Sequence, residues 1–151
     1  MKKLLISIGL GMVLLLSACS GSENKNETTK VETAAESKSV VIDGIRIKIK
    51  KQELDEITVD GKIKQLLTFT VSGENISSTE KGLGSVDFIL KTKDGKELEV
   101  DPSMVMFGDA ISPGKTLTGK VSFTLNEKQT ATKLVYKPLD KELAEWEVSA
   151  Q

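Results

Sequence analysis

The stretch Ile45-Arg46-Ile47-Lys48-Ile49-Lys50 decides the fold class, because isoleucine and a charged residue alternate at every step. A period of two puts the isoleucines on one face of an extended strand and the charges on the other. We therefore expect a strand with one face in the core and one in water. Asp43-Gly44 just before it is typical of a tight turn, so residues 40–42 are predicted to form the preceding strand of a hairpin.

The same alternation returns along the rest of the chain and predicts an all-β protein. A polar stretch containing Asp60-Gly61 follows the first strand, and residues 72–84 are expected to form a loop. Asp94-Gly95 is the best hairpin turn in the chain, and Pro113-Gly114 introduces a later strand. The inward-facing sets are Leu67, Phe69 and Val71; Val86, Phe88 and Leu90; Leu98 and Val100; Leu117, Val121, Phe123 and Leu125; Leu134 and Tyr136; and Trp146 and Val148.

Turn signals between these sets recur every 8 to 12 residues or so, which is typical of an antiparallel sandwich. No stretch carries a sustained helical stripe, and only residues 140–146 are compatible with one helical turn. We expect an antiparallel immunoglobulin-like β-sandwich of about seven strands over residues 39–151.

The N-terminus has the pattern of an export signal. Lys2 and Lys3 precede the uncharged apolar run 4–16, which is shorter than the roughly 20 residues that span a bilayer. The run ends in Leu16-Ser17-Ala18-Cys19, which resembles the lipobox of bacterial lipoproteins. That resemblance implies cleavage between Ala18 and Cys19 and lipidation of the Cys19 thiol. Two or three acyl chains, such as palmitate, then give lasting attachment to the cell membrane.

Residues 19–38 are predicted to be the lipidated cysteine and a flexible tether. The segment after Cys19 is rich in Ser, Thr, Asn, Glu and Lys, with a single valine and no aromatic residue. It cannot bury enough apolar surface to offset the entropy of ordering. The predicted organisation is a signal peptide over 1–18, the anchor and tether over 19–38, and the folded domain over 39–151.

Four pieces of the domain, in their order, resemble a known family. The family is the telokin-like, immunoglobulin-fold extracellular domain of unknown function found in many lipoproteins of Gram-positive bacteria. The resemblance covers roughly residues 40–149 and implies an exported, often lipid-anchored sandwich. The chain differs from true immunoglobulin domains in lacking their paired cysteines. The pieces are LLTFTVSGENISS at 66–78, VDFILKTKDGKELEVD at 86–101, ISPGKTLTGKVSFTLNE at 111–127 and KLVYKP at 133–138.

The residue types present exclude most catalytic chemistry. The chain has no histidine, which removes Ser-His-Asp and Cys-His machinery, and its one cysteine is assigned to the anchor. No P-loop or GxGxxG pattern provides a nucleotide cradle, so no cofactor is expected. A hydrolase with paired carboxylates is the remaining enzymatic alternative, although solvated strand charges are the simpler interpretation. Its candidate residues are Asp87, Glu97, Glu99 and Asp101.

Two groups of side chains have chemistry that suits a metal ion. Met104 and Met106 are two apart, so on a strand both thioethers would face one side and suit Cu(I), although packing is the ordinary role of methionine. A set of acidic loop residues offers oxygen ligands to calcium but lacks the spacing of an EF-hand loop. We predict no metal site at either group. The acidic set is Glu53, Asp55, Glu56, Asp60, Asp101 and Asp109.

The expected sandwich with exposed loops, the lack of catalytic residues and the outward tether favour a protein that binds rather than catalyses. The net charge is −1, and loss of Lys2 and Lys3 with the signal peptide makes it −3, so bulk charge suggests neither a nucleic-acid partner nor an anionic-lipid surface. We expect a non-catalytic binding or adhesion module on the extracytoplasmic face of the cell membrane. Its partner would be a protein, a wall polymer or a small ligand. The alternative is a structural or accessory envelope lipoprotein that assists another membrane complex.

Overall fold

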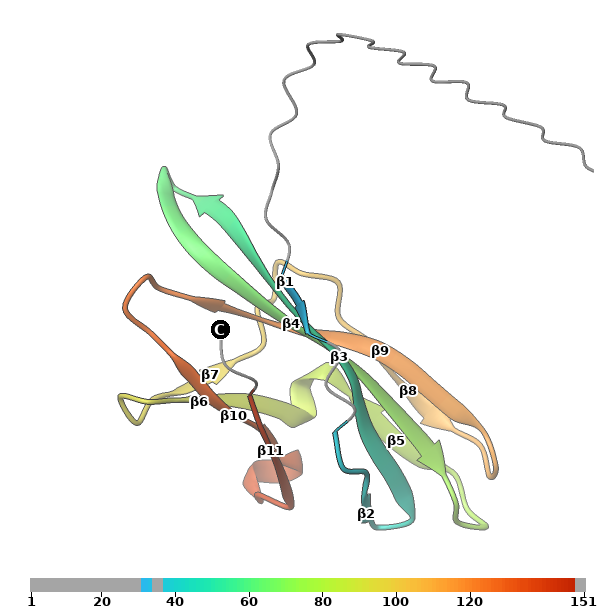
Figure 1. The fold of residues 1–151 in the computed structure, drawn as a ribbon. Coiled ribbons are helices and arrows are strands. Elements are labelled where there is room, and N and C mark those ends of the chain that lie inside the picture. The colour runs from blue at the N-terminus through green and yellow to red at the C-terminus, as the bar shows by residue number, and fades with distance from the viewer. Residues whose placement is uncertain (1–30, 34–36, 149–151) are drawn as a thin grey trace, which may run out of the picture.

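The computed structural model describes residues 31–33 and 37–148 and shows an antiparallel all-β sandwich, which confirms the predicted fold class (Figure 1). A five-stranded sheet has the order β1-β3-β4-β9, with β2 also paired to β3. A four-stranded sheet has the order β11-β10-β6-β7, and a small sheet pairs β5 with β8. The elements are β1 (Val31–Thr33), β2 (Val40–Ile42), β3 (Ile45–Val59), β4 (Lys62–Asn75), β5 (Lys81–Gly84), η1 (Ser85–Asp87), β6 (Phe88–Thr92), β7 (Glu97–Glu99), β8 (Gly108–Ile111), β9 (Thr116–Leu125), β10 (Ala131–Tyr136), η2 (Pro138–Asp140) and β11 (Ala144–Glu147), where η marks a short 3-10 turn.

The longest feature is the β3–β4 hairpin, which grows out of the alternating stretch at 45–50. The three isoleucines of that stretch are buried, as their alternation predicts. The pairing continues as far as Val59 opposite Lys62, so the polar stretch beyond residue 50 is strand and not a break between strands. Asp60 and Gly61 have φ angles of 51° and 71°, which suit the twist of a two-residue hairpin turn.

Three turns predicted from their glycines are present in the structure. Gly44 joins β2 to β3, Gly95 joins β6 to β7, and Gly114 precedes β9; their φ angles are 78°, 80° and 72°. Side chains with a Cβ rarely adopt this left-handed backbone, so glycine is the residue that suits these positions.

The core lies between the two larger sheets. Phe69 meets Phe123 edge-on with ring centroids 6.2 Å apart, and Phe88 lies 5.2 Å from its cross-strand neighbour Tyr136. Burial raises the pKa of the Tyr136 phenol to about 12, so this group stays neutral in the core. Aliphatic side chains fill the remaining space: Ile45, Ile47, Ile49, Leu67, Val71, Leu83, Leu90, Ile111, Val121, Leu125, Ala131 and Leu134.

The structure corrects several predicted elements. The loop expected over 72–84 contains the end of β4 and the whole of β5. Strands β1 and β8 were also not predicted, and the described residues form eleven strands instead of about seven. Val86 lies in η1 and is 70% exposed, so it does not face inward with Phe88. The helical turn expected over 140–146 is absent, because Ala144 and its neighbours pair with β10 as strand β11.

The folded part also begins earlier than predicted. Strand β1, inside the segment expected to be tether, pairs with residues 52–54 of β3. The Ser37 hydroxyl donates to the carbonyl of Ile49 and accepts from its N–H, both at 3.0 Å. The Trp146 indole donates to the Lys38 carbonyl at 3.0 Å. Residues before Ser39 therefore join the five-stranded sheet to β11 along one side of the sandwich.

One end of the sandwich is held by the side chain of Asn75, which is fully buried. Its amide donates to the carbonyls of Thr79 at 2.7 Å and Ile111 at 2.6 Å, and its carbonyl accepts from the N–H and hydroxyl of Ser77. Its backbone bonds both Gly114 and Lys115 in the turn before β9. Two of the sequence pieces that resemble the family, at 75–77 and 112–114, therefore meet at this one residue.

We predict that Asn75→Ala lowers the free energy of unfolding by about 3 kcal/mol, because it removes a buried hydrogen bond to the Ile111 carbonyl and part-buried ones with Thr79 and Ser77. Urea unfolding followed by tryptophan fluorescence measures the loss. Asn126→Ala, at an exposed asparagine, is the matched control and should change stability by less than about 0.5 kcal/mol. Equal effects of the two substitutions would contradict this role for Asn75.

Candidate functional site

The chain between β7 and β8 crosses β9, and we call its residues 101–107 the strap. At one end the Asp101 N–H donates to the Ser122 carbonyl at 2.8 Å. At the other end Phe107 packs directly on Gly119, where an added Cβ would lie only 2.1 Å from the Phe107 ring. Phe107 also exchanges two hydrogen bonds of 2.8 Å with Ser85. The strap is therefore fastened at both ends and leaves its middle residues at the surface.

A hollow lies on each side of the strap, and Met104 borders both. The first, which we call the Glu53 hollow, has a volume of about 500 Å³. Its walls combine apolar side chains from Leu66 and the strap with polar groups from β3, β4 and β9. The second has a volume of about 540 Å³ and includes Ile57, Val59, Leu98 and Val100.

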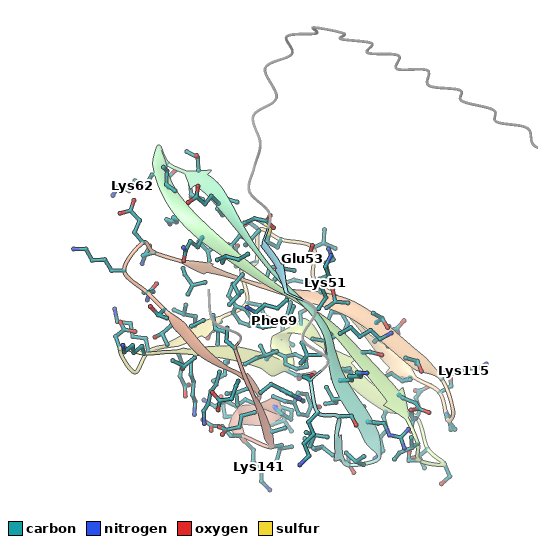
Figure 2. The ribbon with its side chains drawn as sticks, in the orientation of Figure 1. Lys51, Glu53, Lys62, Phe69, Lys115 and Lys141 are labelled. Atoms are coloured by element: carbon teal, nitrogen blue, oxygen red, sulfur yellow. The ribbon has the colours of Figure 1, made fainter. Side chains whose placement is uncertain are left out.

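The floor of the Glu53 hollow is a row of buried polar side chains across three strands. Glu53, Thr68 and Ser122 are register partners, and all three are less than 9% exposed. The Glu53 carboxylate lies 3.2 Å from the Lys51 ammonium and 3.4 Å from that of Lys120. The hydroxyls of Thr68 and Ser122 share a hydrogen bond of 2.9 Å. Figure 2 labels Lys51 and Glu53, which lie close together beside the middle of the five-stranded sheet.

Burial of the Glu53 carboxylate has an energetic consequence. A charge removed from water loses several kcal/mol of hydration, which the two lysines offset. The Lys120 side chain is 61% exposed, so the ammonium group that pairs with the buried Glu53 carboxylate is also accessible from solvent. The hollow therefore offers a ligand an apolar wall, hydroxyl groups and an accessible ammonium group.

The residues predicted for membrane attachment, Ala18 and Cys19, lie outside the described residues. The premise of the copper hypothesis is wrong, because Met104 and Met106 belong to the strap and not to a strand. Met104 borders the two hollows and Met106 is 42% exposed.

The premise of the calcium hypothesis is also wrong. Glu53, Asp55 and Glu56 lie on β3 and not in a loop, because the hairpin continues through the polar stretch. Asp60 occupies the hairpin turn, Asp101 the strap and Asp109 strand β8. Over residues 31–33 and 37–148, no group of three acidic or cysteine side chains is placed to hold a metal ion.

Three of the four carboxylates considered for a hydrolase accept structural hydrogen bonds, and the fourth, Glu99, is exposed on β7. Asp87 accepts the N–H of Gly84 at 2.8 Å. A hydrogen bond from Lys137 lowers the pKa of Glu97. Hydrogen bonds from Ser103 and Thr124 lower the pKa of Asp101. A catalytic general acid needs a raised pKa near the working pH, so Glu97 and Asp101 are shifted in the opposite direction.

The fold and this site define a class: an antiparallel all-β sandwich with an open, partly apolar hollow on one sheet. The chain belongs to the family described as "Domain of unknown function (DUF4352)", whose model matches residues 24–142. No curated protein matches the chain. Over its described part, the structure has no helix that is both long and apolar enough to cross a bilayer.

Solved structures of other bacterial proteins share the fold. A functionally unknown protein of Listeria monocytogenes is 17% identical with a TM-score of 0.53, over 66% of this chain and 67% of that one. A Bacillus subtilis protein named "putative lipoprotein (ycdA)" is 19% identical with a TM-score of 0.56, over 76% and 39%. The secreted protein MPT63 of Mycobacterium tuberculosis is 18% identical with a TM-score of 0.54, over 74% and 92%. At these identities the likeness shows the fold alone.

We predict that Gly119→Ala displaces the strap, because the new methyl group and the Phe107 ring cannot occupy the same space. Overpacking of this kind costs about 1–3 kcal/mol, so the melting temperature should fall and protease cleavage within 101–107 should accelerate. Gly82→Ala is the matched control, since Gly82 is also in a strand and a Cβ there meets no atom within 4 Å. Adding Phe107→Ala to Gly119→Ala should recover part of the loss.

We predict that Asp101→Asn removes a pH-dependent part of the stability. The pKa of Asp101 lies below its ordinary value of 3.8, so the ionised carboxylate stabilises the fold above that pH. This stabilisation is lost as the pH falls through the lowered pKa of the folded state. Urea unfolding at a series of pH values should show a gap between wild type and Asp101→Asn near neutrality that closes in acid. The exposed Asp60→Asn should show a smaller gap, and a gap for Asp101→Asn that widened in acid would contradict the assignment.

Proposed function

We propose that this protein is an extracytoplasmic lipoprotein, held on the cell membrane by acyl chains on Cys19, whose immunoglobulin-like, telokin-like sandwich is a non-catalytic binding module. The ligand contacts the Glu53 hollow and the exposed middle of the strap. The ligand is an extracytoplasmic protein, a wall polymer or a small molecule, and no cofactor takes part.

The observation that carries the proposal is the buried Glu53 carboxylate at the floor of an open hollow. A sheet face that only needed to be soluble could carry its charges in water, without the cost of burying one. Binding sites characteristically combine an apolar wall with a few fixed polar groups. In the Glu53 hollow, Leu66 and Met104 supply the wall, while Glu53 and Lys120 supply the polar groups.

A non-catalytic role is supported by the chemistry of the chain. It has no histidine, and the one cysteine resembles a lipid attachment site. The hydrolase candidates Glu97 and Asp101 have lowered pKa values because each accepts hydrogen bonds that favour the ionised form. These carboxylates hold strands and the strap in place.

An extracytoplasmic location is supported by two independent lines. Leu16-Ser17-Ala18-Cys19 follows a charged and then an apolar segment, which is the order of a lipoprotein signal. Among proteins of the same fold, one is named a lipoprotein and another a secreted protein.

We predict that Cys19→Ala abolishes acylation and leaves an unprocessed precursor. Cys19 is the only cysteine, so metabolic labelling with a fatty acid reports on lipid attached to this residue. Neutral hydroxylamine, which cleaves thioesters, should leave the label in place, because the lipid is joined to Cys19 through a thioether. Ser20→Ala, one residue further along, should be labelled and processed like wild type. Labelling that persisted in Cys19→Ala would overturn the anchor.

The binding module is tested by photo-crosslinking on intact cells. A photoreactive residue replacing Val105, which is 90% exposed on the rim of the Glu53 hollow, should give a discrete adduct. The same residue replacing Val86, 70% exposed in η1, is the control and should not. Thr118→Arg, which fills the hollow from its exposed edge, should remove the Val105 adduct without lowering the melting temperature. Equal adducts at both positions, or none, would reject a site at this hollow.

A further inference from the structure

The turn end of the β3–β4 hairpin carries basic and apolar side chains outside the Glu53 hollow. Ile63 is 55% exposed, and Lys62 and Lys64 flank it. Lys128 comes from the loop after β9, and all four border an open hollow of about 560 Å³. We call Lys62, Ile63, Lys64 and Lys128 the hairpin tip. In Figure 1 this hairpin extends beyond the ends of the neighbouring strands.

The charges of the hairpin tip are available to a partner. Within residues 31–33 and 37–148, none of its three lysines makes an ion pair, whereas Lys81, Lys91 and others on the sandwich do. Asp60 in the turn and Glu127 beside Lys128 are acidic neighbours, and the charge of Lys64 also acts on Asp101, whose pKa it helps to lower. Lysines are attracted to an anionic membrane surface, and an exposed isoleucine adds burial of apolar area.

The register of β1 places the hairpin tip on the side from which the chain reaches the domain. Val31, the first residue of β1, pairs with Leu54, while Thr33 pairs with Gln52. The N-terminal residue of β1 therefore lies nearer the hairpin tip than its C-terminal residue does. Leu54 is five residues from Val59 at the turn, a distance of roughly 17 Å along a strand.

The length of chain between Cys19 and Val31 restricts how far the tip can be from the anchor. These residues are twelve positions apart, so a fully extended chain between them spans at most about 40 Å and a random coil averages roughly 20 Å. A tether this short keeps the tip at an effective concentration in the millimolar range at the bilayer surface, so a weak contact is enough to hold it there.

We propose that the hairpin tip docks on the bilayer that holds Cys19, with its lysines on anionic phospholipid headgroups and Ile63 in the interfacial layer. This inference rests on the proposed lipid anchor. It orients the sandwich with the tip toward the membrane and the opposite end, with β2 and the Asn75 network, toward the exterior.

The test uses the full-length lipidated protein reconstituted into vesicles. Because Cys19 is the only cysteine and its thiol is occupied by lipid, Ile63→Cys provides a single site for a polarity-sensitive fluorophore. Val41→Cys is the matched control, since Val41 is 54% exposed. Val41 pairs with Arg46 of β3, whereas Ile63 pairs with Thr58, twelve residues further along the same strand. The two probes are then roughly 40 Å apart on one hairpin.

In vesicles of equal parts phosphatidylglycerol and phosphatidylcholine, we expect a blue shift for the probe at 63 and none for the probe at 41. The blue shift at 63 should decrease under each of three separate conditions. These are vesicles of pure phosphatidylcholine, about 1 M salt (where the Debye length falls to about 3 Å) and the triple variant Lys62→Glu, Lys64→Glu, Lys128→Glu. Equal spectra at the two positions, or a shift at 63 that ignores salt and lipid charge, would overturn the inference.

Vesicle flotation separates this result from the proposed function. Flotation reports the acyl anchor, while the probe at 63 reports the tip. Protein that floats without a shift at 63 keeps the anchor and rejects tip docking. Protein that fails to float, with a reactive thiol at Cys19 by mass spectrometry, rejects the anchor itself.

Discussion

The pairing of β4 between β3 and β9 is the constraint on which the rest of the structure depends. Its inward side chains form the middle of the core, and its outward side chains form the middle of the polar face. At the end of β4, Asn75 ties this sheet to parts of the chain that lack strong strand patterns. Its side-chain amide bonds the loop at 77–79 and strand β8, and its backbone bonds the turn at 114–115. The position of β4 therefore determines which side chains face the core and which face the polar surface of this sheet.

The strap depends on this sheet in turn. A glycine in β9 leaves room for the Phe107 ring, and the ring brings the segment between β7 and β8 against the sheet. The two hollows exist because the strap stands on β9 instead of passing clear of it. A structural contact, Phe107 on Gly119, therefore creates the surface to which we assign binding.

The proposed anchor, the hairpin tip and the Glu53 hollow together describe a module whose position relative to the membrane matters. Twelve positions separate Cys19 from Val31, which is short compared with a sandwich whose longest hairpin contains a strand of 15 residues. The Glu53 hollow lies beside β1 on the same sheet as the hairpin. In the proposed docked orientation, a ligand therefore approaches this hollow along the bilayer.

The order of residues is enough to predict the fold class, the glycine turns and most of the inward-facing side chains, because alternation and left-handed turns are local properties of the chain. It could not show β5 and β8, whose sequences KGLG and GDAI carry no alternation and which form strands only by pairing with each other. It also could not show the site. A bulge after Ile49 shifts the register of β3, and only that shift sets Glu53 in line with Thr68 and Ser122. Burial of a carboxylate depends on neighbours from three strands, so the tertiary structure alone decided that this stretch is the floor of a hollow instead of an acidic loop.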